Sequence, residues 1–185
     1  EKWRKLSANW EIEGGKMNQS DVFSVILKRN QESIAGAIAD LSHKESVLQL
    51  PGESNCMNWI IGHICVYRDG MIACLGQEEQ MTKSEVNMYR YGSQPIKDDT
   101  DATNFVRLIE LQEAAFHVLI EWLGSAGDVR FLPDIQNNSI KKGYCGYFDT
   151  VSEHFAQMLG HEAIHVGELN ALRELALVQS EKGRK

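Results

Sequence analysis

Apolar residues recur at helical spacing over four long stretches of this 185-residue chain, and this pattern limits the possible folds more than any other feature. Such spacing places the apolar side chains on one face of an α-helix. It predicts helices near residues 20–41, 54–75, 100–124 and 150–178. The alternation of apolar and polar residues that is typical of a half-buried strand is not sustained anywhere, and only three prolines occur.

The segments between these stretches contain helix breakers and polar residues. Pro51-Gly52 separates the first two predicted helices, the polar residues 77–98 are predicted to form a long loop, and residues 125–149 are irregular. Four helices with one apolar stripe each are typical of an all-α, four-helix bundle. The two long connections also allow a crossover topology.

Charge and composition exclude several classes of protein. The formal net charge is −7 with no block of basic residues, which argues against a nucleic-acid-binding protein. No apolar run approaches the roughly 20 residues that span a bilayer, so a membrane protein is not expected. Four cysteines, at positions 56, 65, 74 and 145, form no Cys-x-x-Cys pair. We interpret them as reduced thiols of a cytoplasmic protein.

The first 16 residues are predicted to lie outside the folded domain. The run Gly14-Gly15-Lys16-Met17 can be encoded by a purine-rich ribosome-binding site followed by a start codon. One hypothesis is therefore that residues 1–16 are translated upstream sequence and that residues 17–185 form the domain. An ordinary polar extension or a cloning remnant would explain the same residues, and the nucleotide sequence of the gene distinguishes these hypotheses.

Two histidines of the last predicted helix can share one metal ion. His161 and His165 are four residues apart, which places them about 40° apart around a helix and about 6 Å apart along its axis. They lie beside the apolar stripe, where an unpaired imidazole would cost roughly 1–3 kcal/mol. His154 is about 10 Å from His161 along the axis, too far to share the ion. His63, among apolar neighbours of the second predicted helix, is the best candidate for a third ligand, although a core histidine is the simpler interpretation of His63 alone.

Residues 161–165 also match the H-E-x-x-H motif of zinc peptidases, in which Glu162 would be the general base. Only 20 residues follow His165, and none of them is histidine. Gly167 is one residue too early for the metzincin extension. A zinc peptidase is therefore the least favoured function. Because Glu162 is about 100° from His161 around the helix, we expect Glu162 to take no part in metal binding.

Two segments, taken together, resemble the DinB/YfiT-like superfamily of four-helix bundle proteins. The first reads LPGESN at residues 50–55 and continues as NWIIGHI at residues 58–64. The second reads HEAIHVGEL at residues 161–169 and is followed by Leu172-Arg173. The similarity extends over residues 17–178.

The resemblance implies a metal site. Members of the superfamily bind a divalent metal through one histidine of the second helix and the H-x-x-x-H pair of the last helix, which correspond to His63, His161 and His165. This chain departs from the pattern at Glu168, where the family commonly has glutamine. Three imidazole ligands leave open coordination positions, which is typical of a catalytic site. Zn²⁺, Ni²⁺ and Fe²⁺ all suit imidazole ligands.

The resemblance also implies a function. Characterised relatives are bacterial transferases that use a low-molecular-weight thiol of the bacillithiol or mycothiol type, so we expect a metal-bound thiolate to attack an electrophilic small molecule. Trp59 and Tyr67, one helical turn on either side of His63, are candidates for substrate contacts, with core packing the simpler role for Trp59. A homodimer is the expected assembly. The alternative is a non-enzymatic metal-binding protein of the stress response, because many relatives have no demonstrated activity.

Overall fold

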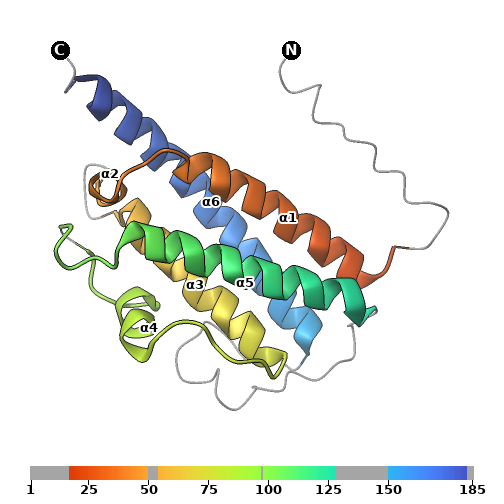
Figure 1. Cartoon of the computed structure of the whole chain (residues 1–185). Coiled ribbons are helices and arrows are strands. Elements are labelled where there is room, and N and C mark those ends of the chain that lie inside the picture. Colours follow the sequence, from red (N-terminus) through yellow and green to blue (C-terminus); the bar gives the residue numbers. More distant parts are fainter. Residues whose placement is uncertain (1–16, 50–53, 97, 128–149, 183–185) are drawn as a thin grey trace, which may run out of the picture.

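The structure, a computed structural model, describes residues 17–49, 54–96, 98–127 and 150–182 (Figure 1). Its helices are α1 (Gln19–Ile38), α2 (His43–Ser46), α3 (Met57–Cys74), α4 (Lys83–Tyr89), α5 (Phe105–Ala126) and α6 (Val151–Lys182). The described residues contain no β-strand, so the prediction of an all-helical chain is confirmed. None of these helices combines the length and apolarity that crossing a membrane requires. Residues 1–16 and the segment around Cys145 lie outside the described ranges.

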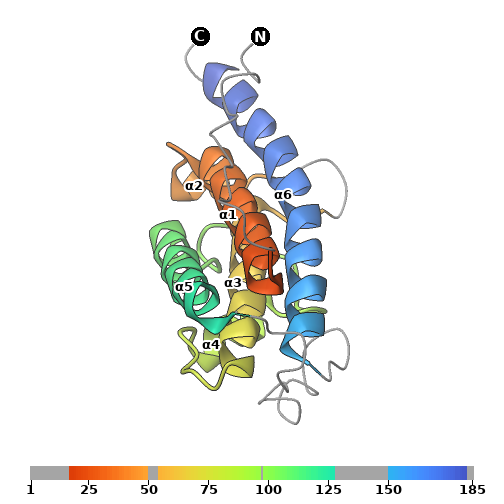
Figure 2. The ribbon, with the colours of Figure 1, turned by 90° about the vertical axis from the view of Figure 1, so that its right-hand side faces the viewer.

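The four long helices pack side by side. Both α1 and α3 contact α5 on one side and α6 on the other (Figures 1 and 2). Figure 1 shows that α1 and α6 run in one direction and that α3 and α5 run in the opposite direction. Since α3 and α5 are parallel, the chain between them returns along the length of α3, which is about 27 Å at 1.5 Å per residue. A crossover, which the long connections allow, is present between α3 and α5.

The most buried helix is α3. All 18 of its residues are buried, including the polar residues Asn58, His63, Arg68 and Asp69. The prediction of a single apolar stripe on this helix is therefore wrong. A helix that is apolar on nearly all sides belongs in an interior, and the polar residues must then find partners within the protein.

Local hydrogen bonds set the helix ends. The prediction of a loop over residues 77–98 is wrong at α4, where Thr82 accepts a hydrogen bond from the Glu85 amide and the Glu85 carboxylate accepts one from the Thr82 amide. This reciprocal capping box satisfies two amides that a short helix would otherwise leave unpaired. Helix α5 begins at Phe105, later than predicted, because Asn104 caps it through the Val106 amide.

Candidate metal centre

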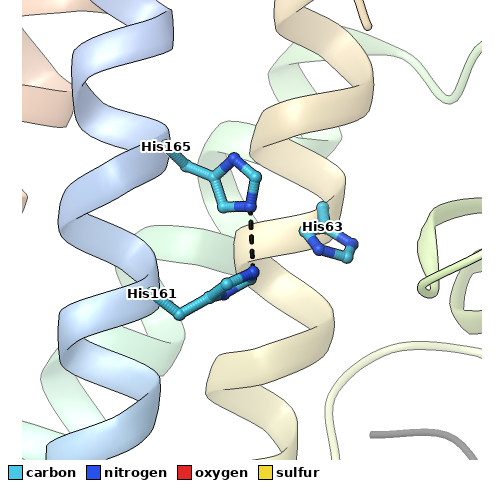
Figure 3. A group of neighbouring side chains, drawn as sticks. All are labelled: His63, His161 and His165. Atoms are coloured by element: carbon cyan, nitrogen blue, oxygen red, sulfur yellow. Dashed lines mark hydrogen bonds between the residues drawn. The ribbon is translucent and has the colours of Figure 1, made fainter. Parts of the chain in front are cut away.

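Three histidines from two helices converge in the interior. His63 projects from α3, and His161 and His165 project from the facing side of α6 (Figure 3). One nitrogen of each imidazole lies within 4.8 Å of the nitrogens of the other two. The Nε2 atoms of His161 and His165 are 3.1 Å apart. Two imidazole donors on one tetrahedral zinc ion, at bond lengths of about 2.0–2.1 Å, are separated by about 3.3 Å. The three residues could therefore hold a metal ion.

The ring of His63 is oriented by a backbone carbonyl. Its Nδ1 lies 2.6 Å from the carbonyl oxygen of Tyr89, the last residue of α4. A carbonyl only accepts, so Nδ1 carries the proton and Nε2 keeps its lone pair. Tyr89 is itself fixed, because its hydroxyl donates to Asn58 Oδ1 at 2.8 Å and accepts from the Thr103 amide at 2.9 Å.

The ring of His165 is oriented by a carboxylate. Its Nδ1 donates to Glu168 Oε2 at 2.7 Å, one turn further along α6. This leaves Nε2, the atom nearest to His161, as the electron-pair donor. A carboxylate or carbonyl on the far nitrogen of a histidine ligand is the usual arrangement around protein metal ions. Glu168 therefore orients the ring of His165 directly.

Burial keeps the imidazoles of His63 and His161 neutral. Burial is the main reason that the pKa of His63 falls from its usual 6.5 to about 4, and the neighbouring His165 and His161 lower it further. Burial and the neighbouring His165 likewise lower the pKa of His161. Only a neutral imidazole can bind a metal, so both residues are in the ligating form at neutral pH.

Trp59 and Tyr67, the candidates for substrate contacts, form walls around the imidazoles. The Trp59 ring stacks on His63 with a centroid distance of 4.4 Å and an interplanar angle of 21°. The Tyr67 ring meets His63 edge-on at 4.6 Å and His161 at 4.4 Å. Both aromatic residues are buried. In this structure they pack against the candidate ligands, and a contact with substrate stays a prediction.

The remaining histidines lie elsewhere. His43 accepts from the Phe105 amide through Nδ1 at 3.2 Å, and its Nε2 donates to the Asp99 carbonyl at 3.1 Å. His117 is exposed on α5, and His154 is buried on α6 outside the cluster of three. His154 thus lies apart from the other two histidines of α6, as its spacing from His161 predicted.

Glu162 does not face the three histidines as a peptidase base would. Its carboxylate is buried and accepts two hydrogen bonds from Arg68, at 2.8 Å from Nε and 3.1 Å from Nη2. A carboxylate held in this way is not free to activate water. Arg68 was not among the residues predicted for the site, although a charged residue within a largely apolar helix indicates that it needs a buried partner.

A cavity of about 570 Å³ lies beside the histidines, where the start of α3 faces α6. Its lining is largely apolar and includes Ile60, Ile164, Gly167 and Leu172, together with Ser54 and Glu168. Glu168 also accepts the hydrogen bond from His165, so a residue in the wall of the cavity directly contacts a candidate ligand. This volume is in the range of pockets that bind small molecules.

Comparison with known proteins supports the fold alone. No family model matches the chain, and no curated protein matches its sequence. The structure is similar to the crystal structure of a conserved protein from Enterococcus faecalis, with a TM-score of 0.60 and 14% sequence identity. The match covers 88% of this chain and 99% of the other. At this identity the likeness shows a shared helical arrangement and carries no activity from one protein to the other.

Proposed function

We propose that this protein is a DinB-like four-helix bundle that binds a divalent metal ion through His63, His161 and His165. The observation that carries the proposal is the orientation of the rings. His63 and His165 each donate their Nδ1 proton to a fixed acceptor, which leaves an Nε2 lone pair on each ring. Three imidazoles, of which those of His63 and His165 have oriented partners, are a donor set that suits Zn²⁺, Ni²⁺ or Fe²⁺.

The activity we propose is the transfer of a low-molecular-weight thiol, of the bacillithiol or mycothiol type, to an electrophilic small molecule. A divalent ion with open coordination positions lowers the pKa of a bound thiol and so favours the nucleophilic thiolate. The chain would supply the three imidazoles, the aromatic walls that exclude water, and the apolar cavity beside Glu168 for the substrate.

A non-enzymatic metal-binding role is the second candidate. It is favoured by the limited access to the site, because His63 is 2% exposed and is covered by Trp59 and Tyr67. A metal ion in such a position would stabilise the contact between α3 and α6 without reaching a substrate.

Metal analysis followed by a conjugation assay tests both candidates. The purified chain is loaded with Zn²⁺, Ni²⁺ or Fe²⁺ and incubated with monochlorobimane and one of several thiols, including bacillithiol and mycothiol. His63→Ala should lose the metal and any conjugation, whereas the control His117→Ala, at an exposed site on α5, should retain both. Metal binding without turnover for any thiol would support the non-enzymatic role. Full metal occupancy in His63→Ala would overturn the proposed site.

A further inference from the structure

Arg68 is a fully buried cation that links all four long helices. It belongs to α3 and donates two hydrogen bonds to Glu162 of α6. Its Nη1 donates to Gln31 Oε1 of α1 at 2.8 Å. The same atom lies 2.7 Å from the backbone oxygen and 3.0 Å from Oε1 of Gln112 of α5. Hydrogen bonds from this one side chain therefore connect α3 to the other three long helices.

Glu162 anchors the part of α6 that carries the histidines. Between Leu159 and Leu169, Glu162 is the one residue of α6 that is buried. Ile164, in the same turn, is 66% exposed. The fully buried attachment of this part of the helix to the interior is therefore an ion pair, next in sequence to His161, and the partly buried Val166 adds an apolar contact.

We infer that the Arg68–Glu162 ion pair is a positioning element for the metal centre, an inference that rests on the metal-binding function proposed above. The pair fixes the rotation of α6 about its own axis, so that His161 and His165 point at His63. This reverses the expectation, drawn from helical spacing, that Glu162 has no part in metal binding.

The geometric tolerance of a metal site shows why such an element is needed. An imidazole nitrogen lies roughly 6 Å from its helix axis, so a rotation of about 10° moves it by about 1 Å. Metal–ligand distances tolerate only about 0.2 Å. Apolar contacts have no preferred direction, whereas the planar guanidinium fixes a carboxylate through two hydrogen bonds of defined geometry.

A double variant without the ion pair distinguishes a purely structural role from a positioning role, because only the positioning role predicts weaker metal binding by a folded protein. Buried ion pairs can often be replaced by apolar residues of similar volume with little loss of stability. The double variant Arg68→Met/Glu162→Leu should therefore fold but lose the directional constraint. Glu162→Gln is a milder change that keeps the side-chain shape and removes the charge. Glu174→Gln, at an exposed position of the same helix, is the matched control.

The experiment measures thermal unfolding of the metal-free proteins, the Zn²⁺ affinity, and the visible absorption of Co²⁺-loaded protein. We expect the double variant to unfold within a few degrees of the wild-type chain but to bind Zn²⁺ about 10–100-fold more weakly, the loss typical when the support of metal ligands is removed. Its Co²⁺ spectrum should change as well. The Glu174→Gln control should match the wild-type chain in all three measurements.

A folded double variant with wild-type Zn²⁺ affinity and an unchanged Co²⁺ spectrum would overturn the inference. If the double variant does not fold, Glu162→Gln decides: weaker Zn²⁺ binding by the folded protein supports a positioning role, and unchanged binding refutes it. Failure of the proposed function is recognised separately, because the wild-type chain itself would then bind neither Zn²⁺ nor Co²⁺.

Discussion

The ring of Tyr89 lies in the space that a side chain at Gly62 would occupy. A Cβ atom added at Gly62 would be 2.3 Å from Tyr89 Cδ1 and 2.4 Å from Cγ. The glycine immediately before His63 therefore lets α4 approach α3 closely enough for the Tyr89 carbonyl to accept a hydrogen bond from that histidine.

Gly62→Ala should weaken metal binding, because the Tyr89 ring has to move and its carbonyl moves with it. We expect a loss of about tenfold in Zn²⁺ affinity and a destabilisation of about 1–3 kcal/mol from overpacking. Zinc titration and thermal unfolding measure the two effects. Gly160→Ala is the matched control, since a Cβ at that helical position meets no atom within 4 Å. Equal behaviour of the two variants would contradict this account of Gly62.

Replacement of Glu168 should lower the Zn²⁺ affinity, and more so for alanine than for glutamine. Glu168→Gln can still accept the Nδ1 proton of His165 but lacks the charge, so a loss of about tenfold is expected, and Glu168→Ala should approach 100-fold. Competition with a zinc chelator measures both constants. Glu174→Ala, an exposed change on the same helix, should have no effect. Unchanged affinity in Glu168→Ala would show that the hydrogen bond to His165 does not contribute to binding.

The metal-free protein should lose stability as the pH falls from 6.5 to about 4. In this range His63 is protonated in the unfolded chain but stays neutral in the folded protein, where its pKa is about 4. The unfolded state therefore binds more protons, and the loss is complete below the folded pKa at about 3 kcal/mol. Urea unfolding with a chelator at several pH values measures it, and His63→Ala should flatten the slope. Stability that rises on acidification would refute the argument.

Zinc should raise the thermal stability of the wild-type chain. Because the three histidines come together only in the folded state, a free ion concentration of 100 times the dissociation constant stabilises folding by about 2.7 kcal/mol. For a chain of this length we expect a rise in Tm of about 5–10 °C. Differential scanning fluorimetry with and without ZnCl₂ measures the shift. Mg²⁺, which prefers oxygen ligands, and the His161→Ala variant should each show no comparable rise.

The parts of this site that lie on one helix were predictable from spacing. His161 and His165 are placed together by helical geometry alone, and His63 was recognisable because its neighbours in sequence are apolar. Tyr89 was not predictable, because it contributes a backbone carbonyl, which any residue could supply. The helix that carries it does have a local signal in the sequence, the Thr82-x-x-Glu85 capping pattern within a polar segment.

The role of the Arg68–Glu162 pair could not be predicted for a different reason. The two residues are 94 positions apart, and their pairing depends on which faces of α3 and α6 meet. The apolar stripe predicts only which side of a helix turns inward. For α3 the prediction of one apolar and one polar face was wrong, because a helix with neighbours on all sides needs no polar face.

The parallel arrangement of α3 and α5 gives the connection between them a second role. A tight turn would suffice if these helices were antiparallel, and the chain would then have no segment over the middle of α3. Here the returning chain includes α4, and the end of α4 supports His63. Any redesign or natural shortening that converted this link into a direct hairpin would thus remove the support of His63 without changing any of the three histidines. The order in which the helices are connected is therefore itself a requirement of the proposed metal site.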